Sequence, residues 1–181
     1  MIDRKEEAMK EAYDNLLTRR SCRAYRSEQI SDRELEMILE AGKYAPTAMG
    51  RQSPLIVAVK TPETVDKIEK LNSAVLGNPD GHPFYGAPAV VVVFAAPSPT
   101  GASDANLVIG NMLNAANAIG VDSCYIWRAK EVFDSEEGRI LKSEWGIPDD
   151  YSGAGNVILG YGKPEGKREP IPRKEGYAII V

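Results

Sequence analysis

Six apolar residues in a row, residues 89–94, place the strongest constraint on how this chain can fold. The run reads Ala-Val-Val-Val-Val-Phe and contains no polar residue. A strand with one solvated face alternates polar and apolar side chains, whereas a uniformly apolar strand is covered on both faces. We therefore expect residues 89–94 to form a strand at the centre of a sheet.

Helical and strand patterns alternate on either side of this run. The expected helices, several of which begin at a capping residue, span residues 4–18, 32–44, 62–76, 104–119 and 136–145. The further expected strands span residues 55–59, 121–127, 155–161 and 177–181. Because the connections are short and the central strands are apolar, the pattern predicts a three-layer α/β or α+β sandwich.

Length and charge narrow the class of protein. The 181 residues suit a single domain, residues 1–181, and the hydrophobic and charged fractions of 43% and 27% are those of an ordinary globular chain. A net charge of −4 lacks the broad basic excess that nucleic-acid binding requires. The longest apolar run, residues 87–96, contains a proline and is about half the length of a membrane-spanning helix. We expect no nucleic-acid partner and no membrane segment.

The cysteine and histidine content limits the chemistry. Cys22 and Cys124 cannot staple a secreted mini-protein, and the N-terminus is charged from its third residue, so we expect a cytoplasmic protein. The single histidine, His82, excludes most metal clusters and the Ser-His-Asp and Cys-His arrangements within one chain. No metal site is expected. If the chain is an enzyme, its chemistry belongs to a bound cofactor.

Two basic clusters stand out in this acidic chain. Residues 19–25 read Arg-Arg-Ser-Cys-Arg-Ala-Tyr, just past the expected end of the first helix, and Arg168, Arg173 and Lys174 form a second cluster on an extended segment. The arginines of the first cluster could simply offset the negative end of the helix dipole. Arginine also suits bidentate phosphate contacts, and Ser21 adds a hydroxyl donor. Together the clusters could clamp one phosphate monoester.

Four short motifs follow one another along the chain. They are Arg-Arg-Ser-x-Arg-x-Tyr at residues 19–25, Ala-Pro-Thr-Ala-Met-Gly-Arg-Gln-Ser-Pro at 45–54, Tyr-Gly-Ala-Pro at 85–88 and Gly-Val-Asp-Ser-Cys-Tyr-Ile at 120–126. In this order and spacing they resemble the nitroreductase family of FMN-dependent oxidoreductases, and its short members in particular. The resemblance implies an α+β fold, a three-layer α-β-α sandwich with a mixed, largely antiparallel sheet. It also implies a domain-swapped homodimer that exchanges C-terminal segments and holds two FMN sites at its interface.

The resemblance assigns FMN contacts to residues of this chain. The phosphate and ribityl end matches Arg19, Arg20, Ser21, Arg173 and Lys174. The loop along the ring and the ribityl chain matches Pro46, Thr47, Ala48, Met49 and Gln52. The strand end that backs the ring, where a backbone N–H can donate to flavin N5, matches Tyr125, Ile126 and Trp127. Arg23 matches the cation near the flavin N1 and O2 edge, where a fixed positive charge stabilises the reduced ring.

Four residues leave alternatives open. Gly50 stands where many relatives carry asparagine, which puts the hydrogen bond to the flavin edge and the acceptor preference in question. Arg128 stands where glycine is common, and its side chain could tune the N5 side or point to solvent. Phe84 and Tyr85 could line an acceptor pocket or anchor the irregular segment 77–88 in the core.

By the same resemblance, the implied activity is a ping-pong reaction. NADH or NADPH passes a hydride to flavin N5, and a small electron-poor acceptor, such as a nitroaromatic, quinone or enone, then takes the electrons. No protein side chain need act as an essential acid or base. Two alternatives remain. One is a specialised flavoenzyme of the same fold with a dedicated substrate, acting by reductive dehalogenation, flavin destruction or dehydrogenation. The other is a non-catalytic flavin-binding dimer.

Overall fold

A four-stranded antiparallel sheet forms the centre of the protein. The computed structural model describes the backbone of residues 4–181 and the side chains of residues 11–181, so the first three residues of the charged N-terminal stretch lie outside it. The strands are β1 (Leu55–Val59), β2 (Ala89–Ala95), β3 (Asp122–Ile126) and β4 (Ser152–Gly160). Their order is β1-β2-β4-β3, and all three pairings are antiparallel. The largely antiparallel character of the expected sheet is confirmed. No two strands of the single chain pair in parallel, so the sheet is not mixed, and the parallel pairing among the described residues is an isolated bridge between Ser21 and Ser123.

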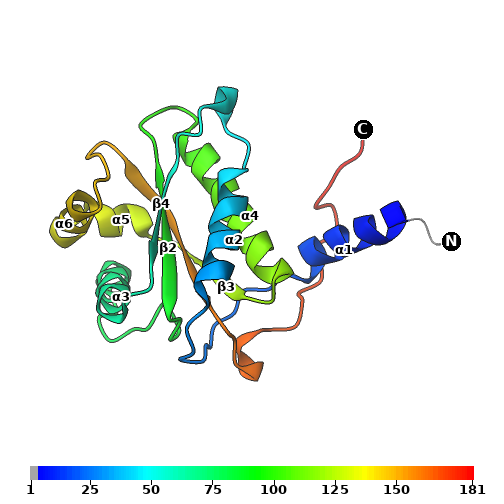
Figure 1. The fold of residues 1–181 in the computed structure, drawn as a ribbon, viewed down its shortest axis with the longest axis horizontal. Helices are drawn as coiled ribbons and strands as arrows, with labels where there is room; N and C mark the ends of the chain where they lie inside the picture. The colour runs from blue at the N-terminus through cyan, green and yellow to red at the C-terminus, as the bar shows by residue number, and fades with distance from the viewer. Residues whose placement is uncertain (1–3) are drawn as a thin grey trace.

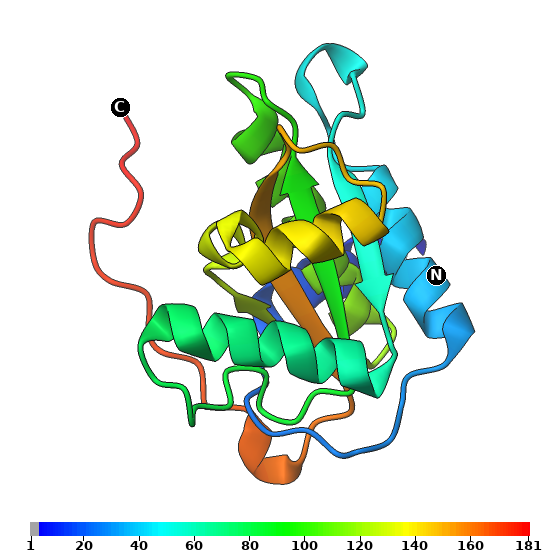
Figure 2. The same cartoon turned by 90° about the vertical axis from the view of Figure 1, so that its left-hand side faces the viewer.

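Helices cover both faces of this sheet, which gives three layers (Figures 1 and 2). One face carries α2 (Asp32–Lys43) and α4 (Gly101–Ala118). The opposite face carries α3 (Pro62–Leu76), α5 (Ala129–Asp134) and α6 (Glu136–Glu144). The remaining helix, α1 (Arg4–Thr18), lies beyond the C-terminal half of α4. The α+β sandwich is thus present as predicted, whereas α5 was not predicted from the sequence.

The central strand explains why residues 89–94 carry no polar side chain. All seven residues of β2 are buried. Val90, Val92 and Phe94 pack into one core with α3, α5 and α6, and the alternate residues of β2 pack into a second core with α2 and α4. The ring of Phe94 meets that of Phe133 edge to face, with 4.9 Å between centroids. Both faces of β2 therefore need apolar side chains.

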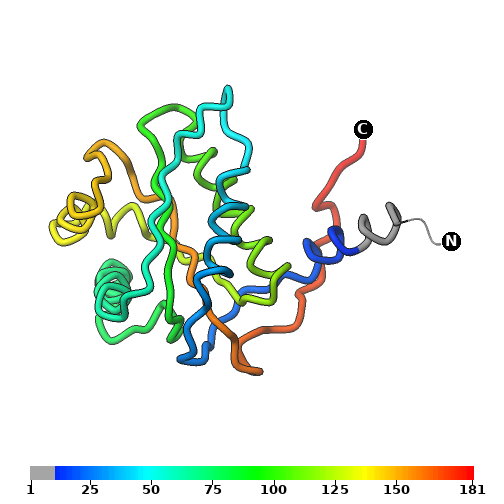
Figure 3. The backbone as a smooth tube through the Cα atoms, in the orientation of Figure 1, coloured from blue at the N-terminus to red at the C-terminus, as the bar shows by residue number. Residues whose placement is uncertain are grey.

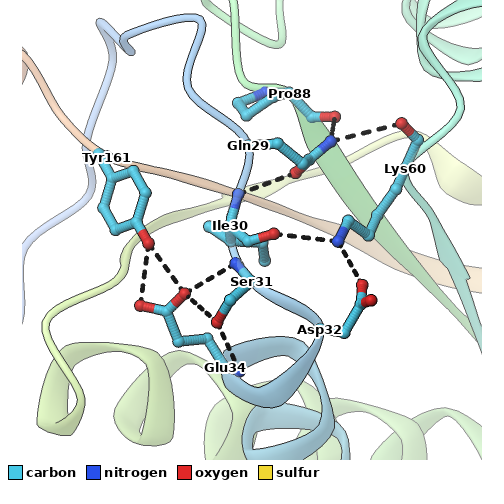
Figure 4. Close-up of polar contacts among 8 residues, drawn as sticks. All are labelled: Gln29, Ile30, Ser31, Asp32, Glu34, Lys60, Pro88 and Tyr161. Atoms are coloured by element: carbon cyan, nitrogen blue, oxygen red, sulfur yellow. Dashed lines mark hydrogen bonds and ion pairs between the residues drawn. The ribbon is translucent and has the colours of Figure 1, made fainter.

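A polar network joins the start of α2 to the end of β4 (Figure 4). Ser31 caps α2, and Glu34 completes the capping box by accepting from the Ser31 amide at 2.8 Å and from its hydroxyl at 2.6 Å. The Tyr161 hydroxyl also donates to Glu34, at 2.8 Å. Lys60 joins the same helix start through an ion pair with Asp32 at 2.6 Å. These contacts connect the start of α2 to the residues that directly follow β1 and β4.

The terminal strand predicted at residues 177–181 is wrong for the single chain. After β4 the backbone forms a short turn, η2 (Pro164–Gly166), and an extended segment that leaves the body of the molecule (Figures 1 to 3). Ile179 and Ile180 are 83% and 98% exposed. A strand needs a neighbour that pairs its backbone N–H and C=O groups, and within the described residues no strand edge lies beside this segment. An apolar terminus is thus left in solvent.

The described residues include neither a helix suited to crossing a membrane nor a cluster of metal-ligating side chains. None of their helices has the length and apolar character needed to cross a bilayer. No group of three or more His, Cys, Asp or Glu side chains among them is arranged to hold a metal ion.

Candidate functional site

A cavity of about 860 Å³ lies between the end of α1 and the C-terminal segment. This volume falls within the range of roughly 300–1,000 Å³ that is common for ligand pockets. Apolar lining comes from Leu16, Leu17 and residues 170–172. The polar lining consists of Arg19, Arg20, Ser21, Arg23, Arg168, Glu169 and Arg173. The structure therefore brings members of both basic clusters to one cavity, although about 150 residues separate them in the sequence.

Five arginines line this cavity, together with one acidic residue, Glu169. Among the described side chains, none of the five forms an ion pair with a carboxylate. Arg20 donates to the carbonyls of Leu17 and Arg19 at 2.7 and 2.8 Å, so its side chain also caps the end of α1. Lys167, by contrast, pairs with Asp122 at 2.5 Å. Like charges that face one cavity repel each other, and a bound anion would relieve that repulsion.

Backbone hydrogen bonds hold residues 22 and 23 between β3 and the C-terminal segment. The amide of Cys22 donates to the carbonyl of Ser123 at 3.0 Å, and the amide of Arg23 donates to that of Gly166 at 2.7 Å. Gly166 permits this close approach, because a Cβ atom there would lie 2.6 Å from Cys22 Sγ and 2.7 Å from the carbonyl oxygen of Ala24. Burial raises the pKa of the Cys22 thiol, which keeps that group neutral beside the arginines.

Lys174 does not line the cavity in the single chain. Its ammonium lies 5.6 Å from the centroid of the Tyr177 ring, further along the C-terminal segment. Arg168 lines the cavity instead, together with Arg173. The family pattern had not assigned Arg168 a contact, although the sequence placed it in the second basic cluster.

The predicted ring-binding loop lies at the opposite end of α4. It contains a short turn, η1 (Ala48–Gly50). The amide of Ala48 donates to Asp104 Oδ1 at 3.1 Å, and the amide of Gln52 donates to Thr47 Oγ1 at 2.9 Å. Met49 and Gln52 have positive φ values of 54° and 50°, which residues with a Cβ rarely adopt.

The loop and the basic cavity are far apart within one chain. Asp104 holds the loop at the start of α4, whereas Asn15 of α1 contacts Asn114 and Asn117 near its end. Ten to thirteen helical residues at 1.5 Å each separate these contacts by about 15–20 Å. Pro46, Thr47, Ala48, Met49 and Gln52 therefore do not line the cavity that holds the arginines.

Of the three residues predicted to back the flavin ring at the end of β3, one has an exposed side chain, the indole of Trp127, and the others can contribute only their backbone. Tyr125 packs into the α4 side of the core, where its hydroxyl donates to the carbonyl of Ala154 at 3.2 Å. Ile126 is buried, and Trp127 is 63% exposed. The guanidinium of Arg128 lies 5.8 Å from the Trp127 ring centroid, and its φ of 75° is one that glycine adopts more readily.

Phe84 anchors its segment in the core. Its side chain is 1% exposed and packs in the core that contains α3, which matches the anchoring alternative rather than the acceptor-pocket alternative. Tyr85 is 38% exposed and stays a candidate for acceptor contact. The segment is also tied to α3, because Glu69 accepts from the Phe84 amide at 2.7 Å and Ser73 donates to the Gly81 carbonyl at 2.7 Å.

Comparison with known proteins assigns the chain to a family. The sequence model of the nitroreductase family matches residues 16–161. The chain belongs to the nitroreductase family. A protein of Archaeoglobus fulgidus with the name "Putative NADH dehydrogenase/NAD(P)H nitroreductase" is 31% identical over 164 residues, which cover 87% of this chain and 88% of that protein. The family resemblance drawn from four motifs is thereby confirmed.

Solved structures of nitroreductases share the fold. The crystal structure of a nitroreductase with bound FMN from Bacteroides fragilis has a TM-score of 0.86 and 29% identity, over 94% of this chain and 98% of that one. A nitroreductase with bound FMN from Desulfitobacterium hafniense has a TM-score of 0.85 at 24% identity, over 94% and 98% of the two chains. The four-stranded α+β architecture is thus that of nitroreductases.

Asp104 is a site-forming residue that the sequence analysis missed. It is 4% exposed, and it occupies the same stripe of α4 as the buried residues Val108 and Met112. A carboxylate on an apolar stripe is rarely buried unless a partner satisfies it. That pattern was visible in the sequence, but the partner, the Ala48 amide, is 56 residues away.

Proposed function

We propose that this protein is an FMN-dependent NAD(P)H oxidoreductase that reduces small electron-poor acceptors. The observation that carries the proposal is the cavity lined by five guanidinium groups and Ser21, none of the five paired with a carboxylate among the described side chains. Membership of the nitroreductase family and the FMN-bound relatives support it. An aromatic nitro compound, a quinone or an enone is the proposed acceptor class.

The donors in the cavity suit the phosphate end of FMN. Arg19, Arg20 and Arg173 would hold the phosphate through charge-assisted hydrogen bonds, and Ser21 would add a hydroxyl donor. Arg23 would place a fixed positive charge near the ring. When bound, FMN would supply the hydride and electron chemistry, from NAD(P)H to the acceptor. The protein would bind, orient and tune this group, and no side chain need transfer a proton.

The site we propose is completed by a second copy of the chain. In one chain the arginines and the loop at residues 46–52 lie toward opposite ends of α4, and no residue of this loop lines the cavity that holds the arginines. The exposed apolar residues of the C-terminal segment, among them Ile179 and Ile180, give a second chain a surface to cover. In a homodimer that exchanges these segments, the partner's loop would lie along the ring.

FMN uptake tests the phosphate assignment. Arg20→Ala combined with Arg173→Ala removes two charge-assisted contacts, each worth roughly 1.5–3 kcal/mol. We expect FMN affinity to fall by at least about a hundredfold, measured by quenching of flavin fluorescence on titration of the protein. Arg33→Ala with Arg139→Ala is the matched control, because it removes the same charge from exposed positions on α2 and α6. Wild-type affinity in the first variant would contradict the phosphate assignment, and a wild-type protein that takes up no FMN would contradict the proposed function.

Anaerobic reduction separates the enzyme from a non-catalytic flavin protein. We expect NADH or NADPH to bleach the bound flavin, and nitroaromatics, quinones or enones to restore its colour. Bleaching no faster than in buffer alone would favour the flavin-binding dimer without turnover. A dedicated substrate would be indicated if only one acceptor of a broad panel restored the colour. The segment 77–86 gives no support to an added lid, because α3 anchors it at Glu69 and Ser73.

A further inference from the structure

The backbone of residues 126–128 turns sharply as it leaves β3. β3 ends at Ile126, Trp127 is exposed, and Arg128 adopts a left-handed φ of 75° immediately before α5. A residue with a Cβ is disfavoured in this region, so the turn persists only where the surrounding structure holds it.

Two buried asparagines hold this turn from the core side. Asn72 Nδ2, on α3, donates to the carbonyl oxygen of Trp127 at 3.0 Å. Asn156 Nδ2, on β4, donates to the carbonyl oxygen of Ile126 at 3.3 Å. Both asparagines are 0% exposed. Two side chains from different elements therefore donate hydrogen bonds to two consecutive backbone carbonyls.

Neither asparagine is well satisfied by this arrangement. Asn72 Oδ1 and Asn156 Oδ1 are buried, and neither accepts a hydrogen bond from any described residue. Buried polar atoms normally have partners, and an apolar residue of similar size would leave no acceptor unpaired. Asn72 also stands on the buried stripe of α3 with Val65 and Ile68, where the helical pattern calls for an apolar side chain. The side-chain amides of Asn72 and Asn156 share one role, which is to hold the turn at residues 126–128 by hydrogen bonds.

The two hydrogen bonds from the asparagines fix the direction in which two backbone N–H groups point. In a trans peptide unit the C=O and N–H groups point in opposite directions. With the carbonyls of Ile126 and Trp127 drawn toward the core, the amides of Trp127 and Arg128 point away from it. Within the described residues, these two amides donate to no backbone or side-chain oxygen. They form a prearranged pair of donors beside an exposed indole ring.

We infer that Asn72 and Asn156 are positioning residues that aim the amides of Trp127 and Arg128 at the acceptor atoms of the bound flavin ring. The inference rests on the proposed function and on the family resemblance, which assigns the flavin ring to this strand end. Donors that are fixed before the ligand binds need no reorganisation when it does, so a looser turn would bind the ring less well. Neither asparagine would touch the flavin itself.

The test replaces each asparagine by a residue of similar size that cannot donate. Asn72→Leu and Asn156→Leu remove the hydrogen bonds to the turn, and Asn72→Asp keeps the shape of the side chain but loses its amide donor. We expect the FMN dissociation constant to rise about 2–10-fold in each variant, as for one weakened hydrogen bond, and the visible circular dichroism of the bound flavin to change. Ser73→Ala is the matched control, because Ser73 is equally buried on α3 but holds the Gly81 carbonyl instead.

Limited proteolysis of the FMN-free protein measures directly how firmly the asparagines hold the turn at residues 126–128. Trypsin cleaves after arginine, and we expect native-state cleavage after Arg128 to be faster in the asparagine variants than in the wild type or Ser73→Ala. Faster cleavage with a wild-type FMN dissociation constant and dichroism would overturn the inference, since the asparagines would then act on stability alone. Unchanged cleavage would overturn it as well. If the wild-type protein binds no FMN, it is the proposed function that fails.

Discussion

Asp104 Oδ1 accepts a hydrogen bond from the backbone amide of Ala48 at 3.1 Å, which fixes the loop at residues 46–52 to the first turn of α4. The carboxylate is nearly inaccessible to solvent, and the Thr100 hydroxyl donates to its other oxygen at 3.3 Å. We expect Asp104→Ala to lower the free energy of unfolding by about 1–3 kcal/mol, because it leaves the Ala48 amide without its acceptor. Urea denaturation measures this loss.

Asp104→Asn gives the matched comparison. The asparagine keeps a carbonyl oxygen where Oδ1 stands, so it should recover a good part of the stability lost in the alanine variant. Equal losses in the two variants would show that the charge, and not the acceptor, stabilises the loop.

Acid should weaken the junction between α2 and β4. Hydrogen bonds from Ser31, with a further one from Tyr161, hold the pKa of Glu34 below its ordinary value of 4.5. The unfolded chain therefore binds more protons than the folded one between the two pKa values, and the free energy of unfolding rises with pH in that window. We expect it to fall more steeply in the wild type than in Glu34→Gln as the pH drops below 4.5. Urea titrations across the acid range check this, with Glu36→Gln as an exposed control on the same helix.

A side chain at Gly166 should destabilise the protein. A Cβ atom would meet Cys22 Sγ and the Ala24 carbonyl at less than 3.0 Å. We expect Gly166→Ala to cost about 1–3 kcal/mol of stability through overpacking, and to weaken FMN uptake by moving Arg168 and Arg173 away from residues 19–23. Adding Cys22→Ala removes one of the two clashes, so the double variant should be less destabilised than the sum of the single ones. Strict additivity of the two losses, measured by urea denaturation, would argue against the contact.

The C-terminal segment should decide the oligomeric state that we propose. Removing residues 175–181 deletes Ile179 and Ile180, whose side chains are exposed in the single chain. We expect light scattering to show a dimer for the full chain and a monomer for the shortened one. Thermal unfolding of the full chain should also depend on protein concentration, since association stabilises the folded state by mass action. A shortened chain that stays dimeric would show that another surface holds the two copies.

Much of the fold could be predicted because its signals are local. The apolar run at residues 89–94, the capping box at Ser31 and Glu34, and the helical stripes report backbone conformation and burial within a few residues. The strand expected at residues 177–181 failed for the same reason. Its apolar pattern was real, but a strand forms only where a second edge is available to pair with it.

The candidate site combines local and long-range information. The two basic clusters and the four family motifs were legible in the sequence by itself, because they depend on residue type and spacing. Only the tertiary structure decided that Arg23 and Arg173 line one cavity, that Phe84 is buried, and that the loop at Ala48 lies at the opposite end of α4 from this cavity. Those outcomes depend on which distant segments of the chain pack together. Local periodicity carries no information about which residues meet at each end of α4.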